Sequence, residues 1–222
     1  MIYKLNTTLF AFLFALSGYY TDSRRSPAAA SMGDEPFLLA VQDVITVTGR
    51  GLLVSGVIER GVIRVGDIVE LVGSPYGGVI KAAVKAIELF HKSVTEAKKG
   101  ESVGLLFSSI ESKDVLRGMV VCQPGTAKAY SEFKCKLHLN SKEEGGRTSS
   151  IADKYSPLFV LRTAWISGDI TLPAGMQSLQ PGDDAEVMVL LLVPAVMEKG
   201  MEFLIREGNR AVGRGKIVAV IR

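Results

Sequence analysis

The chain has 222 residues, of which 47% are hydrophobic and 22% charged, and this composition excludes intrinsic disorder over most of its length. Its 26 Lys and Arg against 23 Asp and Glu give a net charge of +3, which is too small to indicate a nucleic-acid partner. With only Cys122 and Cys135, and no CxxC spacing, neither a structural zinc site nor a disulfide framework is indicated.

Residues 1–34 differ in composition from the rest. Positions 5–21 carry no charge, 9–16 are wholly apolar, and the segment that follows is rich in Ser and Ala and contains Arg24-Arg25. The apolar block fits a secretory signal, the arginines fit an organellar transit segment, and a two-part leader would explain both. A mis-joined first exon without a role is the alternative. The apolar run is shorter than the ~20 residues that cross a bilayer, so we expect no stable membrane span and leave 1–34 out of the fold prediction.

From residue 35 onward the sequence predicts strands separated by glycine and proline. Enrichment in β-branched and aromatic residues predicts strands over 37–47, 52–58, 67–72, 79–90 and 103–107. Turns are predicted at 49–51 and 59–61, a loop at 73–78, and one short helical turn around 112–116. Because a tight turn between strands needs a left-handed residue, we expect a positive φ at Gly51.

Pro124-Gly125 marks the predicted boundary between two units, 35–125 and 126–222. Apolar residues at 133, 135, 137 and 139 alternate with polar ones at 134, 136 and 138, as in a half-buried strand, so His138 is expected to be solvated. His91 is expected to be solvated too. Later strands are predicted over 157–163, 185–193, 201–205 and 216–221. Strand-rich units of about 90 residues avoid exposed edges by closing, so the predicted fold is all-β, with two consecutive antiparallel β-barrels.

The sequence contains no recognisable catalytic constellation. A phosphate-binding loop of the form GxxxxGK[ST] is missing, since Gly215-Lys216 is followed by Ile217. The acidic pairs 143–144 and 183–184 stand beside glycine and are expected to be solvated turn residues, not a general acid and base. The residues therefore predict a binding or structural protein without catalytic or metal-binding residues.

From residue 33 to 222 the sequence resembles the second and third domains of bacterial-type elongation factor Tu. The stretches that carry the resemblance, in the same order, are PFLLAVQDV (36–44), TGRGLLVSGVIERG (48–61), VGDIVELVG (65–73), GESVGLL (100–106), RGMVVCQPG (117–125), SKEEGGR (141–147), SGDITLP (167–173), QPGDDAEV (180–187) and IREGNRAVGRG (205–215). That family consists of GTPases that carry aminoacyl-tRNA to the ribosome. The resemblance implies one barrel like its domain 2 and one like its domain 3, without the GTPase domain. GTP and Mg²⁺ are then expected only if a GTPase domain is supplied elsewhere.

The resemblance also implies RNA-contacting positions in the first unit. The pocket that receives the aminoacyl end corresponds to Gln42, Asp43, Ile45, Ser55 and Ser102, of which Asp43 agrees with the family. The family usually has Glu at position 42, Phe at 45, Thr at 55 and Asn at 102. The loss of an aromatic ring at Ile45 removes a stacking face worth about 1 kcal/mol, so the pocket is expected to be degraded. Arg117 matches the family arginine near the tRNA 5′ end.

In the second unit, Arg147, Glu207 and Gly208 agree with family positions that face the T-stem of tRNA, and Ser167 replaces a Thr. Leu158 and Thr148 depart from a family Gln and a family His. Further cations near the C-terminus are expected to form a local cluster that could hold phosphates: Arg206, Arg210, Arg214 and Lys216.

Three functional hypotheses follow. The chain is a truncated organellar elongation factor Tu, located in a mitochondrion or plastid, whose GTPase domain is encoded upstream. Alternatively, it is a two-barrel protein that retains binding of aminoacyl-tRNA or the ribosome, with a GTPase domain or a Ts-like nucleotide-exchange factor as a further candidate partner. The third hypothesis is a structural scaffold subunit of a larger organellar assembly that uses the barrels for protein contacts. A secretory-type leader would change the compartment.

Overall fold

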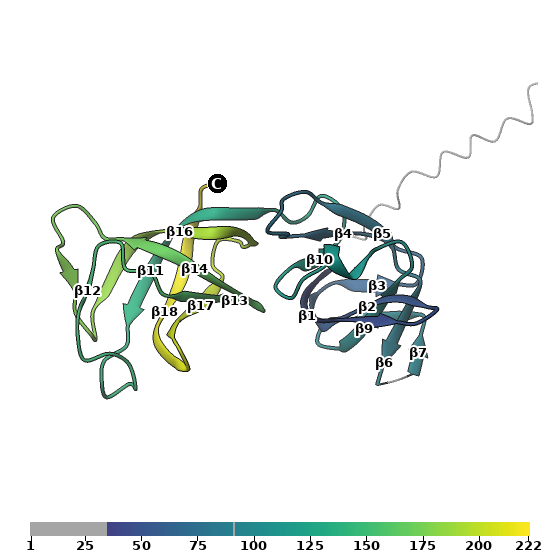
Figure 1. The fold of residues 1–222 in the computed structure, drawn as a ribbon, viewed down its shortest axis with the longest axis horizontal. Helices are drawn as coiled ribbons and strands as arrows, with labels where there is room; N and C mark the ends of the chain where they lie inside the picture. Colours follow the sequence, from purple (N-terminus) through teal and green to yellow (C-terminus); the bar gives the residue numbers. More distant parts are fainter. Residues whose placement is uncertain (1–34, 91) are drawn as a thin grey trace, which may run out of the picture. The chain divides into compact units, whose positions relative to one another are not determined.

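A computed structural model of the chain describes residues 35–90 and 92–222 (Figure 1). The predicted leader at 1–34 and His91 lie outside the described residues. Glu35–Arg222 form one compact unit made almost entirely of strands, and the only helical segment in the described ranges is the 3₁₀ turn η1 (Ser112–Asp114). The all-β prediction and the predicted helical turn are therefore confirmed.

The first half of the unit is a sheet of eight strands in the order β5-β4-β10-β1-β2-β9-β6-β7, referred to here as the N-terminal sheet. Its strands are β1 (Leu38–Val47), β2 (Gly51–Arg60), β4 (Ile68–Val72), β5 (Ile80–Ala83), β6 (Ala86–Leu89), β7 (Lys92–Val94), β9 (Ser102–Phe107) and β10 (Val120–Cys122). A separate pair, β3 (Val62–Arg64) and β8 (Glu96–Lys98), accompanies it. The inward residues of these strands, including Leu39, Val54 and Leu105, form one hydrophobic core.

Two backbone features shape the β1–β2 hairpin. Gly51 at its turn has φ +123°, which confirms the expected positive φ, and a Cβ there would lie 2.1 Å from the Phe107 carbonyl oxygen. A register shift between Val41 and Asp43 places Gln42 in a bulge, because Val41 pairs with Gly56 and Asp43 already pairs with Ser55. Before the bulge, Leu38, Leu39 and Ala40 pair with β10 on one side and with β2 on the other.

The second half closes into a six-stranded barrel in the order β11-β16-β14-β13-β17-β18, drawn from teal through green to yellow in Figure 1. This C-terminal barrel consists of β11 (Ala129–Leu139), β13 (Leu158–Leu161), β14 (Ala164–Thr171), β16 (Asp184–Val196), β17 (Glu202–Glu207) and β18 (Arg210–Val220), with β12 (Ile151–Ala152) and β15 (Ser178–Leu179) paired beside it. Phe133, Phe159 and Phe203 meet inside it with ring centroids 5.6–6.1 Å apart. The alternation predicted for 133–139 is confirmed, since Cys135 and Leu137 are buried with Phe133.

Three predicted element boundaries are wrong. The predicted turn at 59–61 is strand up to Arg60, which pairs with Leu38, and only Gly61 bends the chain. The run 79–90 is two strands. β5 pairs with β4 at one end of the strand order, whereas β6 pairs with β9 near the opposite end. The last strand begins at Arg210 and not at 216, because residues 210–216 pair with β17.

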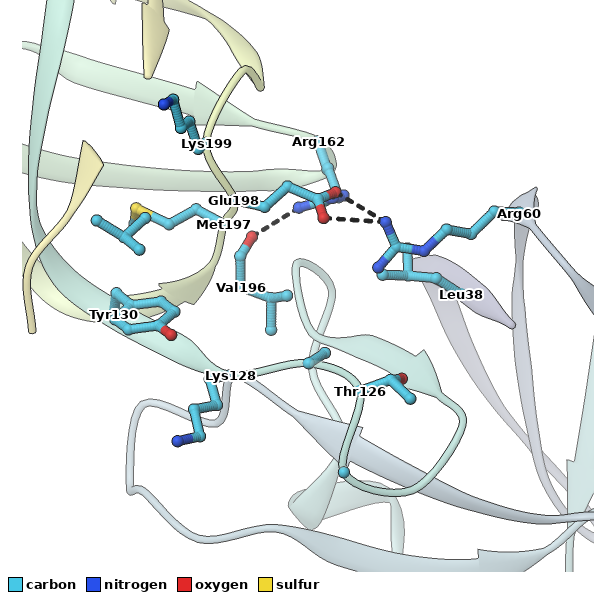
Figure 2. Close-up of a pocket in the computed structure, with 13 residues that line it drawn as sticks. Leu38, Arg60, Thr126, Lys128, Tyr130, Arg162, Val196, Met197, Glu198 and Lys199 are labelled. Carbon is cyan, nitrogen blue, oxygen red and sulfur yellow. Dashed lines mark hydrogen bonds and ion pairs between the residues drawn. The ribbon is translucent and has the colours of Figure 1, made fainter. Parts of the chain in front are cut away.

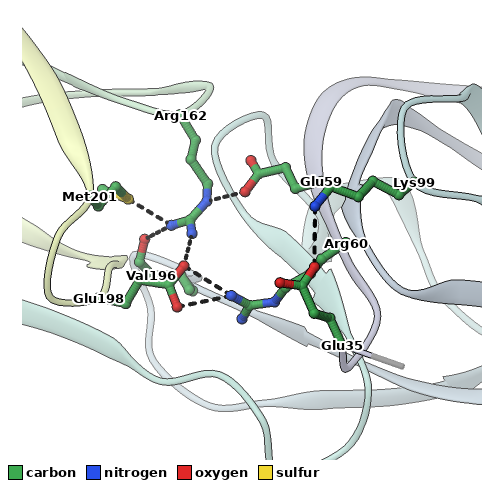
Figure 3. Close-up of polar contacts among 8 residues, drawn as sticks. All are labelled: Glu35, Glu59, Arg60, Lys99, Arg162, Val196, Glu198 and Met201. Atoms are coloured by element: carbon green, nitrogen blue, oxygen red, sulfur yellow. Dashed lines mark hydrogen bonds and ion pairs between the residues drawn. The ribbon is translucent and has the colours of Figure 1, made fainter. Parts of the chain in front are cut away.

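Apolar and charged contacts join the N-terminal sheet to the C-terminal barrel. Leu38, Val120 and Cys122 share a small hydrophobic cluster with Val196 of β16. Figure 3 shows the charged contacts: the Arg162 guanidinium, on a side chain only 8% exposed, lies 2.8 Å from Glu59 and 2.7 Å from Glu198, and it donates to the Val196 carbonyl. Arg60 contacts both oxygens of the same Glu198 carboxylate. We refer to Glu59, Arg60, Arg162 and Glu198 as the Arg162 clasp.

Candidate functional site

The predicted pocket residues of the first unit are neighbours on β1, β2 and β9. Asp43 pairs with Ser55, and Ser55 pairs in turn with Gly104, two residues after Ser102 on β9. Because Val54 and Val103 point into the core, Ser55 and Ser102 face outward. Strand pairing therefore brings Asp43, Ser55 and Ser102 together on one exposed face.

Side-chain interactions among these residues are few. One oxygen of the Asp43 carboxylate accepts the backbone N–H of Val44 at 2.8 Å, and the Ser55 hydroxyl lies 3.4 Å from the Asp43 carbonyl. Gln42 is exposed in the bulge, and Ile45, 48% exposed, pairs with Leu53 on the same strands. The face thus has a carboxylate oxygen without a partner among the described residues and short hydroxyls, but an aliphatic side chain instead of an aromatic platform.

Arg117 stands where the sheet and the barrel meet. Its Nη1 lies 3.4 Å from the Gln42 carbonyl and its Nε 3.4 Å from the carbonyl of Thr163, which precedes β14. An arginine has five N–H donors in a fixed fork, and these long contacts use two of them. Arg117 is exposed, so the rest of its guanidinium is available to an anion.

In the C-terminal barrel, Arg147 and Glu207 are brought into direct contact although they are far apart in the sequence. The Arg147 Nη1 donates to Glu207, and the Tyr155 hydroxyl donates to the same carboxylate oxygen. The Arg147 Nε and Nη2 each donate to Ser149 at 3.1 Å, and its guanidinium lies 5.1 Å from the Tyr155 ring centre. Burial, followed by the Glu207 carboxylate, raises the pKa of Tyr155 and keeps it a neutral donor. Arg147 is therefore oriented and charge-compensated before any ligand arrives.

Ser167 lies in a row across the outer face of the same barrel. It pairs with Leu158 on β13, and Leu158 pairs with Arg206 on β17, next to Glu207. Gly208 follows in the turn before β18 with φ +55°. The structure thus gathers the predicted residues Arg147, Ser167, Glu207 and Gly208 around the β13, β14 and β17 strands.

Beside this row lies one residue that the sequence reasoning missed. Trp165 precedes Ser167 by two positions on the outward face of β14, is 53% exposed, and has the Arg206 guanidinium 5.3 Å from its ring centre. The sequence held a signal for it, because Ala164, Ile166 and Gly168 alternate as buried positions and leave the chain's single Trp facing out.

The expected basic cluster is only partly available for phosphates. Lys216 lies 3.7 Å from Glu202, and Arg214 lies 3.0 Å from Glu144. Arg206 on β17 donates to the Asn209 carbonyl at 2.6 Å, and Arg210, the first residue of β18, is exposed. The cluster is therefore divided between Arg206 on β17 and three cations on β18, and two of its four members already have carboxylate partners.

The prediction that His138 and Glu144 are merely solvated is wrong. The His138 Nε2 lies 2.9 Å from Glu144 and its Nδ1 3.1 Å from Asp184, and the imidazole is only 19% exposed. The hydrogen bond to Glu144 raises the pKa of His138 against the opposing effect of burial. The backbone N–H of Ser141, followed by His138 and Arg214, holds the pKa of Glu144 at about 2. The alternation of apolar and polar residues correctly predicted that His138 lies on the polar face of β11. It could not show which carboxylates the fold places beside His138.

A pocket of about 380 Å³ lies beside the Arg162 clasp (Figure 2). Leu38, Val196 and Met197 give it apolar walls, and Tyr130, Lys128 and Lys199 stand at its edge. Figure 2 shows the amino groups of the two lysines pointing away from each other, while the Arg60 guanidinium is directed at Glu198. Burial disfavours the Glu198 charge, but hydrogen bonds and charges from Arg60 and Arg162 outweigh it and lower its pKa. The pocket therefore presents no converging free cations.

Two features are absent from the described part of the chain. No group of three or more His, Cys, Asp or Glu side chains there is placed to hold a metal ion. Among the same residues, no helix has the length and apolar character to span a membrane. Both cysteines are free and buried, and burial raises the pKa of Cys135 to about 12, which makes it unreactive as a thiolate.

Two family models match the chain, and together they span most of the two sheets. Residues 51–122 match the model described as Elongation factor Tu domain 2. Residues 126–221 match the model described as Elongation factor Tu C-terminal domain. The matched ranges include every candidate position given above except Gln42, Asp43 and Ile45 on β1.

Proposed function

The chain belongs to the elongation factor Tu family, and from this premise we propose that it is a module of protein synthesis that binds tRNA through domains 2 and 3 of that family. The observation that carries the proposal is the placement of the family-like positions. Asp43, Ser55 and Ser102 share one outer face, Arg147 and Glu207 share another, and Arg117 lies at the junction. A tRNA has a continuous phosphate backbone, so cations on both sheets can contact it at once.

The proposed binding depends little on an aminoacyl group. Ile45 is aliphatic and exposed, and Ser102 presents a short hydroxyl where the family has an amide. A module that keeps its phosphate contacts but lacks the aromatic and amide groups of the pocket recognises the body of the tRNA more than its charged end. We therefore assign the main affinity to Arg117 and the C-terminal barrel.

We propose no catalytic residues in these two domains. The matched models are the second and C-terminal domains of the family, which are not its nucleotide-binding domain. In this proposal, GTP and Mg²⁺ are bound only by a GTPase domain that is supplied elsewhere. That GTPase domain, or a Ts-like nucleotide-exchange factor, is then a partner of the chain. Addition of a purified GTPase domain of this family should then increase tRNA affinity.

We further propose that the protein works in a mitochondrion or plastid. The support is the bacterial-type resemblance together with the uncharged apolar block and the arginine pair in residues 1–34. A fluorescent fusion of the full chain tests this: organellar fluorescence is expected, and secretion would contradict it. Replacing Arg24 and Arg25 with Gln should reduce organellar import.

A scaffold subunit in an organellar assembly is the alternative, and exposed apolar side chains favour it. Trp165, Leu192 and Leu204 are exposed on strands of the C-terminal barrel, and exposed apolar residues of this size are typical of protein contacts. The departures from the family at Ile45 and Ser102 also fit a protein released from the aminoacyl-binding role.

Salt-dependent tRNA binding distinguishes the two functions. We expect the affinity for uncharged tRNA to fall steeply between about 50 and 200 mM salt, and neutralising Arg117, Arg147 and Arg206 to Gln should flatten the logarithmic slope by about three units. The matched control replaces the exposed Lys81, Lys99 and Lys113 by Gln, which removes the same charge elsewhere. Binding that ignores salt, or that responds equally to both triple variants, would refute the phosphate contacts assigned to these arginines and support the scaffold.

A further inference from the structure

His138 lies between two carboxylates, with one on each ring nitrogen. Its Nδ1 is 3.1 Å from Asp184 on β16, and its Nε2 is 2.9 Å from Glu144 in the loop after β11. A neutral imidazole carries one N–H, so one of its nitrogens would present a lone pair to a carboxylate. Only the imidazolium can donate to both acids, and the geometry is therefore that of a protonated histidine.

Glu144 connects this histidine to the backbone of its own loop. The oxygen that meets His138 also accepts the Ser141 N–H at 2.9 Å, and the other oxygen accepts Arg214 of β18 at 3.0 Å. Arg214 donates in addition to the Asn140 side chain at 3.2 Å. Glu144 thus fastens loop 141–146 to β11 through His138 and to β18 through Arg214. His138 in turn contacts Asp184 of β16.

The fastened loop ends at Arg147. Gly146 donates its N–H to the Ser141 carbonyl at 2.7 Å, and the Arg147 N–H donates to the Asn140 carbonyl at 3.2 Å. These bonds close the base of the loop and fix the backbone position of Arg147, whose side chain reaches Glu207. The backbone of Arg147 therefore continues directly from the loop that Glu144 holds.

We propose that His138 is a positioning residue for Arg147: its imidazolium holds loop 141–146 through Glu144 and Asp184, and tRNA affinity falls when His138 loses its proton. The effect on tRNA rests on the function proposed above, whereas the effect on the loop does not. Since the guanidinium also has partners in Tyr155 and Ser149, the loop tunes the affinity of Arg147 and does not abolish it.

The charges around the histidine set the direction of the pH dependence. Facing His138 or one rung away are Lys136 on β11, Glu143 and Glu144 in the loop, Asp184 and Glu186 on β16, and Arg214 and Lys216 on β18. The pKa of His138 is raised in the folded state, so its interaction with the two carboxylates is complete below pH 6.5, the ordinary histidine pKa. The interaction is lost as the pH rises through the raised pKa. Glu144, with its pKa at about 2, stays ionised throughout that window.

The loop is tested first, without RNA. Because the chain has only His91 and His138, His91→Gln leaves one histidine signal for NMR titration of the full chain. We expect its midpoint above 6.5 and amide exchange over 141–147 that accelerates across the same midpoint. Glu144→Gln should lower the midpoint. A midpoint at or below 6.5, or loop exchange that does not follow it, would overturn the proposal.

The second test measures uncharged-tRNA affinity at constant ionic strength from about pH 5.5 to 8.5. We expect the natural protein to lose about fivefold more affinity than His138→Gln over this range, a coupling at the low end of those seen between sites. Lys113→Gln, which removes an exposed charge on η1 in the N-terminal half, is the control and should follow the natural protein. Equal pH dependence of the natural protein and His138→Gln would refute the coupling. If amide exchange over 141–147 follows the titration of His138 but tRNA binds at no pH, the proposed function fails and the loop-fastening role stands.

Discussion

In the N-terminal sheet the candidate residues are held in place by strand pairing, whereas in the C-terminal barrel they are held by a network of charged and hydroxyl side chains. Asp43, Ser55 and Ser102 become neighbours because β1, β2 and β9 are in register, and their side chains make few contacts. Arg147 and Glu207 instead contact each other directly, with Tyr155 on the same carboxylate.

This difference bears on the departures from the family pattern in the N-terminal sheet and on the Arg147–Glu207 pair. An outward side chain on a paired strand can be exchanged without disturbing the backbone, so Gln42, Ile45, Ser55 and Ser102 are free to change while the sheet persists. Removing Arg147 or Glu207 would leave a partly buried charge without its partner, which is costly, so that pair is retained with the fold. Retention of Arg147 and Glu207 is therefore weaker evidence of RNA binding than retention of an exposed residue such as Arg117.

The largest expected effect tests whether backbone geometry really holds the N-terminal sheet. Gly51→Val places a Cβ 2.1 Å from the Phe107 carbonyl at φ +123°, so we expect a loss of about 3 kcal/mol or more in unfolding free energy. Gly49→Ala is the matched control, because its φ of +73° is also left-handed but nothing lies within 4 Å of the added Cβ; about 1 kcal/mol is expected. Denaturant unfolding of both variants measures the difference. Equal losses would contradict the close approach at Gly51.

The next effect tests whether the two regions unfold as one. Arg162→Met removes the guanidinium that contacts Glu59 in the sheet and Glu198 in the barrel, and we expect a loss of about 2 kcal/mol, less than for a fully buried pair because both carboxylates are partly exposed. Arg162→Lys keeps the charge without the fork and should lose about half as much. If the clasp couples the regions, fluorescence of Trp165 and far-ultraviolet dichroism will give separate unfolding midpoints in Arg162→Met. Coincident midpoints with unchanged stability would show that the apolar cluster at Val196 suffices.

The sequence was most informative where the local structure depends only on the alternation of residues along one strand or on a single turn. The alternation at 133–139 predicted β11 with its buried Phe133 and Cys135, and Gly51 was predicted to have a positive φ because it joins two strands. The run 79–90 was misread as a single strand because β5 and β6 are both strand-like, and only the pairing of each with a different neighbour separates them.

The candidate site was less predictable because side-chain partners come from distant strands. The resemblance supplied Arg147 and Glu207 separately, and nothing in the local sequence of either indicates their contact. His138 was expected to be solvated, since alternation reports which face a residue occupies and not which charges meet it there. The Arg162 clasp was missed for the same reason: Glu59 and Glu198 lie in different halves of the chain.

A gain of function would sharpen the contrast between the proposed degraded pocket and the proposed phosphate-binding surface. Ile45→Phe with Ser102→Asn restores the family residues at two outward positions, where no repacking of the core is needed. We expect the ratio of affinities for aminoacylated over uncharged tRNA to rise from near one to about fivefold, as about 1 kcal/mol of stacking and hydrogen bonding implies. Leu53→Phe, on the neighbouring strand, adds an aromatic ring without restoring the family pattern and should leave the ratio near one. A strong preference for charged tRNA in the natural protein would contradict the degraded pocket.

The smallest effect decides what the outer face of the C-terminal barrel binds. Trp165→Ala removes an exposed indole that stacks on Arg206, and because the side chain is half in solvent we expect little change in stability. One ring face is already covered by the guanidinium, so tRNA affinity should fall by only about threefold, below the usual range for an aromatic that stacks on a base. Leu204→Ala, a matched loss of apolar surface on neighbouring β17, should leave tRNA affinity unchanged because an aliphatic side chain offers neither stacking nor charge. If neither variant alters tRNA binding while both weaken association with a purified protein partner, the face is a protein interface and the scaffold function is favoured.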